Sequence, residues 1–306
     1  MSRPLIALDA EVLLRRVAGR VPRTLRDNIV VIGSIATAWA FRDVARTAMV
    51  ATKDIDLLLQ PSIDAVSTAE SLGAQLLSEG WTPRFPKDVE RGTAATPDHE
   101  LPALRLTPPD DLDGWFVELL ADPPACQATR KHWRRFVTPQ GDFGLPSFRF
   151  MRVAIHAAPE ALLGLRAAEP ACMALAHLLE HADPDRTPIS GLPGNPPRFV
   201  KDVGRAVALW WLANQQSPLA PLRWRDQWED ALRATFPDRR DELFTGAGHA
   251  LLALEPYLRD AHQIAVNSVL APHGTPIEAF RRAFSGLDCL VGSALPRREQ
   301  GPGSMA

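Results

Sequence analysis

The sequence predicts an α+β fold in which a small mixed β-sheet with flanking helices is followed by an α-helical domain. Two observations predict it. Up to about residue 158, short apolar runs with strand character alternate with segments whose apolar residues recur at helical spacing. Beyond that point the segments have helical periodicity. We therefore expect an α/β domain over 1–158, a helical domain over 159–295 and a flexible tail over 296–306.

The expected elements of the first half follow one another closely. Strands are short runs rich in valine, isoleucine or leucine, and the helix that ends near Gly80 has a plausible C-cap there. Prolines interrupt the chain from 81 to 113, which favours long loops. The expected helices cover 8–19, 34–45 and 63–80, and the expected strands cover 28–33, 54–59, 103–107, 115–121 and 147–155.

The second half is a series of helices joined by loops. A stretch rich in proline and glycine at 183–197 predicts one of these loops. Several tryptophans lie on the expected helices, where helix packing is their more common role. The expected helices cover 169–182, 198–215, 224–236, 248–270 and 276–291.

Composition narrows the function classes. The 306 residues carry a formal net charge of −2, which indicates neither nucleic acid nor an anionic membrane as a partner, and there is no DNA-binding signal. No apolar stretch approaches the ~20 residues of a membrane span. Three separated cysteines form no CxxC pair and suit a reducing compartment, and acidic residues within the apolar N-terminal run argue against a signal peptide. We expect a cytoplasmic protein.

The stretch DID, at 54–56, is the first candidate site. Residues i and i+2 of a strand point to the same face, so Asp54 and Asp56 project together. Two carboxylates at this spacing repel each other unless a cation lies between them, and Mg²⁺ suits carboxylate and phosphate oxygens. Alone, such a pair is more often a solvated face, but the leucines that follow favour a partly buried strand.

A Gly-Ser turn precedes this strand. Gly33 and Ser34 stand between an apolar strand and an alanine-rich helix, so free backbone N–H groups there could bind phosphate. Ser34 could cap the helix or donate to a phosphate oxygen. A lone Gly-Ser is usually just a turn, and the prediction depends on its order with the aspartate pair.

The two motifs in this order resemble those of the polymerase-β-like nucleotidyltransferase superfamily. The similarity is closest to the branch of AbiEii-type toxins and minimal bacterial nucleotidyltransferases, since Gly33-Ser34-Ile35-Ala36 and Thr52-Lys53-Asp54-Ile55-Asp56 follow its pattern. The resemblance implies a nucleotidyltransferase core. It also implies a third carboxylate on a later strand, which falls at Glu118 within WFVELLA.

The resemblance continues more weakly into the helical half, from Glu169 to Leu209. There it implies Lys201 and Asp202 at the start of a helix, and its expected lysine falls at His177, where a neutral ring would lack the charge. The implied catalytic and metal-binding residues are Asp54, Asp56 and Glu118, and the implied nucleotide-binding residues are Gly33, Ser34, Thr52, Lys53, His177, Lys201 and Asp202.

The activity that the resemblance implies is transfer of a nucleoside monophosphate from a nucleoside triphosphate to an acceptor hydroxyl, with two Mg²⁺ ions and release of pyrophosphate. The acceptor stays open between a small hydroxylated molecule, RNA and protein, and related proteins occur in toxin–antitoxin pairs. The alternative is a non-catalytic member that binds a nucleotide or a partner protein. His177 in place of lysine and Glu118 in place of aspartate keep that alternative open.

A basic cluster with aromatic residues, RKHWRRF at 130–136, is the remaining candidate. It could grip a nucleic-acid backbone, or be the solvated face of a helix or an edge strand. Other chemistries lack their motifs, because the chain has no HExxH, GxGxxG, P-loop or GxSxG sequence.

Overall fold

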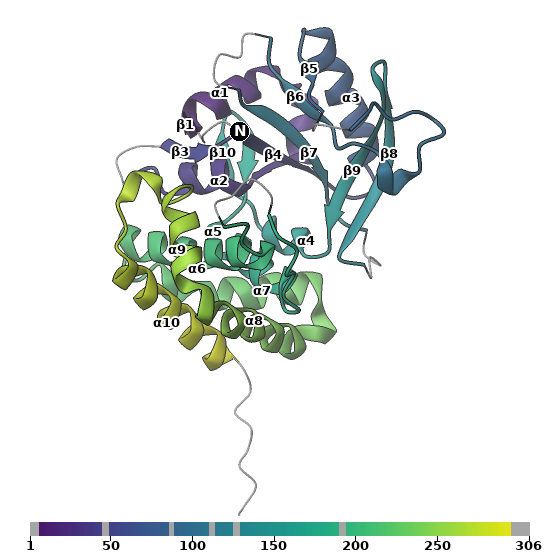
Figure 1. Ribbon diagram of the computed structural model, residues 1–306. Helices are drawn as coiled ribbons and strands as arrows, with labels where there is room; N and C mark the ends of the chain where they lie inside the picture. Colours follow the sequence, from purple (N-terminus) through teal and green to yellow (C-terminus); the bar gives the residue numbers. More distant parts are fainter. Residues whose placement is uncertain are drawn as a thin grey trace, which may run out of the picture.

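The protein has the predicted α+β fold. The computed structural model describes residues 6–44, 49–85, 89–109, 114–124, 129–189 and 194–294. A seven-stranded mixed sheet occupies one half of the molecule, and helices fill the other half (Figure 1). The tail expected at 296–306 lies outside the described residues.

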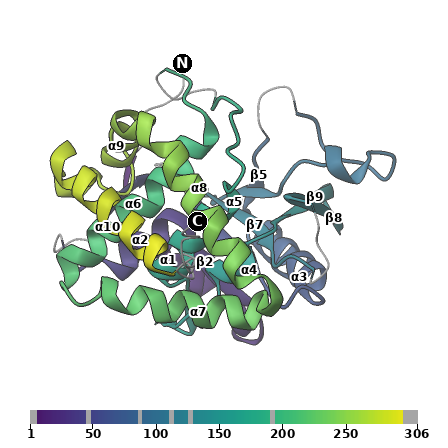
Figure 2. The same ribbon diagram turned by 90° about the horizontal axis from the view of Figure 1, so that it is seen from below.

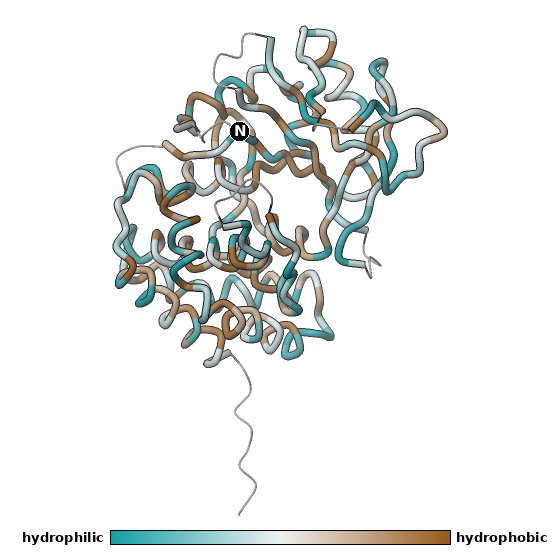
Figure 3. Tube along the Cα trace, in the orientation of Figure 1, coloured by the Kyte–Doolittle hydropathy of each residue, from teal (hydrophilic) through white to brown (hydrophobic). Residues whose placement is uncertain are grey.

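Three central strands carry the core of the sheet. Strand β2 is antiparallel to β4, and β4 is parallel to β7. Their side chains are mostly buried and apolar, and the hydropathy colouring shows this brown centre (Figure 3). In sheet order the strands are β10 (Glu160–Leu162), β11 (Leu165–Ala167), β2 (Ile29–Ile32), β4 (Asp54–Leu59), β7 (Phe116–Ala121), β6 (Arg105–Thr107) and β5 (Thr82–Pro83).

Helices α1 (Ala10–Arg20), α2 (Gly33–Ala40) and α3 (Ala65–Ser78) flank the sheet near their predicted positions. Asp9 caps α1, because its Oδ1 accepts hydrogen bonds from the backbone N–H groups of Glu11 and Val12, at 2.8 and 3.1 Å. The expected helix over 34–45 is shorter, since α2 ends at Ala40. Two strands that were not predicted, β1 (Ile6–Asp9) and β3 (Met49–Thr52), pair in an antiparallel ribbon. Along the chain, β1 directly precedes α1 and β3 directly precedes β4.

The strand predicted over 147–155 is wrong for most of its length. Only Ser147 and Phe148 are extended, as the end of β9 (Gly141–Phe148), which pairs with β8 (Lys131–Thr138) in a hairpin. Residues 151–154 form the short helix α4. The backbone N–H of Phe150 donates to the side chain of Glu180 at 2.8 Å. This contact with a distant helix holds the end of the strand, although the alternating residues alone favour a longer one.

The sheet continues past residue 158, where the first domain was predicted to end. The short strands β10 and β11 pair with each other, and β11 extends the sheet beside β2. Leu163 and Gly164, at φ of 54° and 80°, form the tight left-handed turn between them. Strands of three residues are too short for a periodic pattern, so the sequence gives no signal that the sheet continues to Ala167.

The second half is helical, as predicted, with one break. The expected helix over 248–270 is divided at Pro256 into α8, which begins earlier, and α9. Seen from below, α7, α8 and α10 lie in front of the sheet (Figure 2). None of the described helices combines the length and apolar character needed to cross a bilayer. The helices are α5 (Pro170–Glu180), α6 (Arg198–Gln216), α7 (Trp224–Thr235), α8 (Arg240–Leu254), α9 (Leu258–Val266) and α10 (Ile277–Ala294).

Tryptophans on the helices pack against one another, as their positions predict. The ring centroids of Trp210 and Trp224 are 5.1 Å apart, and those of Trp224 and Trp228 are 6.0 Å apart. The indole N–H of Trp228 donates to the carbonyl of Ala171 at 2.8 Å. This cluster fixes α5, α6 and α7 together, and α6 carries residues that face the sheet.

Candidate functional site

The sheet brings the three predicted carboxylates together. Asp54 and Asp56 lie two residues apart on β4, so both side chains leave the same face. Asp56 is in register with Glu118 on the parallel neighbour β7, and paired residues of adjacent strands share a face. The three carboxylates therefore lie on one face, over two adjacent strands.

Burial and repulsion among these carboxylates change the pKa of Asp56. Burial raises the pKa of Asp56 well above its usual range, and the carboxylates of Asp54 and Glu118 raise it further. Arg205 and Lys201 act in the opposite direction without cancelling the rise. A cation placed between the carboxylates would relieve this repulsion, so the donor chemistry of Asp54 and Asp56 fits a hard divalent metal.

The Gly-Ser turn touches the same carboxylate. Ile32, the last residue of β2, is in register with Asp56, and Gly33 begins α2 at a φ of 72°. A Cβ on Gly33 would lie 2.5 Å from Oδ2 of Asp56. Both the left-handed backbone and the close carboxylate require glycine here. The start of α2, which favours anions, and the aspartate face therefore form one continuous site.

Glu118 already has a partner. Arg105, in register with it on β6, donates from Nε to Oε2 of Glu118 at 2.7 Å. Across the described residues, no three His, Cys, Asp or Glu side chains are gathered as a metal-ligand set. The metal-binding role that the resemblance implies for Glu118 therefore stays a prediction. The pair Asp54 and Asp56 fits a metal, whereas Glu118 stands beside the pair and is held by a guanidinium.

Thr52 and Lys53 support the start of β4. The hydroxyl of the buried Thr52 donates to Oδ1 of Asp54 at 2.6 Å and so fixes that carboxylate. The backbone carbonyl of Lys53 accepts a hydrogen bond from Phe116 at 2.9 Å. Thr52 thus orients Asp54, and the backbone of Lys53 joins the start of β4 to β7.

Helix α6 brings two cations to the carboxylates. Arg205 donates from Nη2 to the hydroxyl of Ser34 at 3.1 Å, which links α6 to the Gly-Ser turn. Lys201, one helical turn earlier, also lies close enough to lower the pKa of Asp56. Lys201 was predicted at the site, whereas Arg205 was missed, although the i, i+4 spacing of the two cations was a usable signal.

His177 does not replace the expected lysine charge. Burial, together with the nearby Arg205, lowers its pKa to about 3, so the ring is neutral at pH 7. Its neighbourhood also includes Lys201, Asp202 and His181. His177 therefore lies beside the two cations of α6, and Arg205 supplies the positive charge that the histidine lacks.

Asp202 points to a different partner. Its Oδ2 lies 3.0 Å from Nε2 of the buried His181 on the adjoining segment of α5. Burial opposes the charge of Asp202, but the hydrogen bond from His181 and the ammonium of Lys201 outweigh burial and hold its pKa below the usual range. Asp202, whose role in binding nucleotide stays a prediction, joins α6 to the end of α5.

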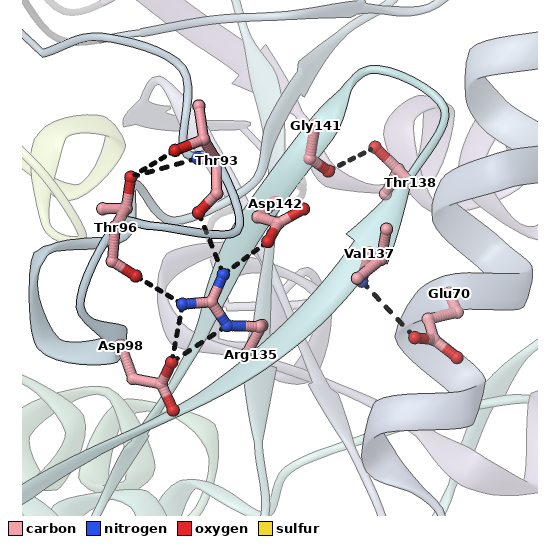
Figure 4. A network of polar contacts seen from close by, with 9 residues as sticks. All are labelled: Glu70, Thr93, Thr96, Asp98, Arg135, Val137, Thr138, Gly141 and Asp142. Atoms are coloured by element: carbon pink, nitrogen blue, oxygen red, sulfur yellow. Dashed lines mark hydrogen bonds and ion pairs between the residues drawn. The ribbon is translucent and has the colours of Figure 1, made fainter.

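The basic cluster lies on strand β8, and its arginines are mostly engaged. Arg135 binds the carboxylates of Asp98, at 3.0 Å, and Asp142, as well as the backbone carbonyls of Thr93 and Thr96 (Figure 4). This network ties the 93–98 loop to the hairpin. Arg135 therefore supports the fold and is not available to grip a nucleic-acid backbone.

The two other arginines of this cluster, Arg130 and Arg134, also support the fold. Arg130 donates to Asp185 at 2.7 Å, and Arg134 donates to the backbone carbonyls of Ser62 and, at 3.2 Å, Asp122. Lys131 differs, because it lies near Glu118, Arg105 and Arg198. Lys131 is therefore the cation of this cluster that lies near the candidate site.

A cavity of about 620 Å³ lies elsewhere, between the end of α5, the middle of α8 and the start of β8. No predicted site residue lines it. It includes Glu180, whose pKa is raised to about 7 by burial, and whose Oε1 accepts from Phe150. The carboxylate face and this cavity are therefore separate features.

Comparisons of the chain with protein-family models, with curated proteins and with solved structures give no match. What the site can do therefore has to be argued from its own geometry.

Proposed function

We propose that this chain is a metal-dependent nucleotidyltransferase that moves a nucleoside monophosphate from a nucleoside triphosphate to an acceptor hydroxyl. One observation carries the proposal. The turn at Gly33, which opens a helix, lies against Asp56, and Asp56 is in register with Glu118. A phosphate-binding turn and paired carboxylates at one place are what the resemblance to polymerase-β-like nucleotidyltransferases implies.

The outer phosphates bind at the Gly-Ser turn. Helix α2 begins at Gly33 with no side-chain cap, so the free backbone N–H groups of its first turn favour an anion. Arg205, which now donates to Ser34, and Lys201 supply positive charge from α6. A guanidinium binds phosphate oxygens with two parallel hydrogen bonds, so Arg205 can exchange the serine hydroxyl for the nucleotide.

Asp54 and Asp56 would hold Mg²⁺, with Thr52 fixing the orientation of Asp54. When bound, the metal neutralises charge on the phosphate oxygens as the transfer proceeds. Ser34 and Arg205 keep the departing pyrophosphate at the start of α2.

Glu118 faces the acceptor. The acceptor hydroxyl oxygen forms a bond to the α-phosphorus, the bond between that phosphorus and the bridging oxygen breaks, and pyrophosphate leaves. Glu118, next to Asp56 on the sheet, takes the hydroxyl proton. Arg105 holds Glu118 in place for this role.

The test is calorimetric binding of each of the four nucleoside triphosphates, with and without Mg²⁺, to wild type and to the double variant Asp54→Asn/Asp56→Asn. The expected result is Mg²⁺-dependent binding that the double variant loses. A matched control removes two exposed carboxylates of the helical half, Asp226→Asn/Glu278→Gln, and should bind as wild type. Equal binding by all three proteins would overturn the assignment.

A second function has its own observation. Glu118 is paired with Arg105, and His177 is neutral, so a protein that binds a nucleotide without transferring it, as a sensor or as a partner of another protein, is the alternative. Mg²⁺-dependent binding, with no pyrophosphate released in the presence of candidate acceptors, would favour this alternative.

A further inference from the structure

One face of the β8–β9 hairpin carries an aromatic surface capped by a cation. Lys131 and Trp133 are two residues apart on β8, and Phe148 pairs with Lys131 in register, so the three side chains share a face. Nζ of Lys131 lies 4.0 Å from the ring centroid of Trp133 and 5.5 Å from that of Phe148. This hairpin face, defined by Lys131, Trp133 and Phe148, has both a positive charge and flat rings.

The hairpin face borders the carboxylates. Lys131 lies near Glu118 and Arg105 of the sheet, and near Arg198 at the start of α6. The preceding residue, Arg130, lies outside β8, binds Asp185 and lines the 620 Å³ cavity. Within β8, strand alternation places Lys131 and Trp133 on one face of the hairpin.

The hairpin face also lies on the far side of the carboxylates from the Gly-Ser turn. The turn follows β2, whereas Glu118 is on β7, beyond β4, and β9 packs against β7. In a phosphoryl displacement the attacking and leaving oxygens lie roughly in line, on opposite sides of the phosphorus. With pyrophosphate held at the turn, the acceptor approaches from the side of Glu118, which is the side of the hairpin.

The chemistry of this side selects the acceptor. Lys131, Arg105 and Arg198 repel a polycationic acceptor and attract an anionic one. Trp133 and Phe148 offer rings on which a flat base can stack. We propose that the hairpin face binds the acceptor, and that the acceptor is the end of a single nucleic-acid strand, with a base on Trp133 and a phosphate on Lys131.

This inference rests on the proposed transferase function. Lys131 is exposed and now lies over Trp133, a contact that an exposed lysine exchanges readily. When a base stacks on Trp133, the ammonium of Lys131 moves to the phosphate beside that base. The arginines of the 130–136 cluster take no part, because they serve the fold.

The experiment measures the fluorescence anisotropy of a labelled ten-nucleotide single-stranded RNA titrated with the full chain. Wild type should bind it, and Trp133→Ala should bind about 10-fold more weakly, because a stacked base is lost. Trp133→Phe keeps a ring and should stay close to wild type. Lys131→Gln should weaken binding and reduce the dependence of affinity on salt by about one phosphate contact.

Controls separate this inference from the proposed function. Arg282→Gln removes an exposed cation on α10, far along the chain, and should leave RNA binding unchanged. Calorimetric binding of nucleoside triphosphate should be retained by every hairpin variant, so its loss in all of them would mark misfolding. Lys131→Gln, at an exposed position, keeps the test valid where Trp133→Ala does not fold.

Two results would overturn the proposal. One is equal RNA affinity in wild type, Trp133→Ala and Lys131→Gln. The other is tighter binding of an RNA duplex than of the single strand, because paired bases cannot stack on the hairpin. Nucleotide binding that persists in either case would leave the proposed function standing with another acceptor.

Discussion

Asp56 and Asp202 are two partly buried aspartates whose pKa values move in opposite directions. Asp56, on β4, is surrounded by the carboxylates of Asp54 and Glu118, and its pKa is raised well above the usual range. Asp202, on α6, bonds to His181 beside Lys201, and its pKa is lowered. Both were predicted from short motifs, yet Asp56 lies among other carboxylates, whereas Asp202 is hydrogen-bonded to His181 and lies near the ammonium of Lys201.

The difference separates a binding site from a structural contact. A buried carboxylate whose hydrogen bonds are already made gains little from a ligand, and losing its partner is costly. Carboxylates that repel each other destabilise the folded protein. A cation that binds between them removes this electrostatic repulsion. Under the proposed function, the aspartates of β4 bind a ligand, whereas Asp202 joins α6 to the end of α5.

The largest expected effect is the loss of activity in Asp56→Asn. Nucleotidyl transfer should fall by about 1000-fold or more, equivalent to about 4 kcal/mol of transition-state stabilisation. Stability should be retained or should rise, because the charge of Asp56 disfavours the folded state. Pyrophosphate release and urea denaturation measure the two quantities. If Asp56→Asn kept full activity and unchanged stability, the difference in role proposed for Asp56 and Asp202 would be wrong.

Asp202→Asn should show the reverse. We expect a loss of about 3 kcal/mol in the free energy of unfolding, because His181 loses its charged partner in a buried place. Since the folded pKa of Asp202 is depressed, its contribution is present above the unfolded value of about 4 and is lost as the pH falls below it. For Asp56, whose folded pKa is raised, the cost is absent below about pH 4 and grows as the pH rises. Urea denaturation from pH 7 down to about pH 2, with Asp226→Asn as control, checks both signs.

Gly33→Ala tests the turn itself. The left-handed φ and the 2.5 Å approach to Asp56 should cost about 1–3 kcal/mol of stability and weaken nucleotide binding. Gly19→Ala is the matched control, because the helical Gly19 has no atom within 4 Å of an added Cβ. That control should be neutral or slightly stabilising. Equal effects of the two substitutions on thermal denaturation would contradict the role given to Gly33.

The smallest effect is expected at Arg205. Arg205→Gln should weaken triphosphate binding about 10-fold, since a charged hydrogen bond near the turn is lost. Arg205→Lys should weaken it less, because the charge stays while the two-point guanidinium contact does not. Calorimetry measures the triphosphate affinity of both variants. If Arg205→Gln bound triphosphate as tightly as wild type, Lys201 rather than Arg205 would be the residue that contacts the phosphates.

Local patterns predicted the parts of the site that lie close together along the chain. The order of a strand, Gly33-Ser34, a helix and a strand with Asp54 and Asp56 appears in the sequence, and the structure confirms these elements. Glu118 was implied by the family resemblance, and the structure places it in register with Asp56. A period of two or 3.6 residues is a local property, so a single sequence reports it well.

Pairing between distant segments was not predictable in this way. Arg105 reaches Glu118 across β6 and β7, Lys131 reaches the same place from a hairpin, and β10 and β11 join the sheet after the expected boundary. None of these contacts has a local period. They depend on which strands become neighbours, and burial of the shared core decides that.

The sequence by itself determined the α+β class, the glycine that the turn requires and the common face of Asp54 and Asp56, because each follows from residue type and spacing. Only the tertiary structure decided which charges meet. It placed Arg205 on Ser34, Arg105 on Glu118 and His181 on Asp202, and it left Asp56 among carboxylates. The reason is physical: electrostatic interactions depend on distance and burial between segments far apart in the chain, and these exist only after folding.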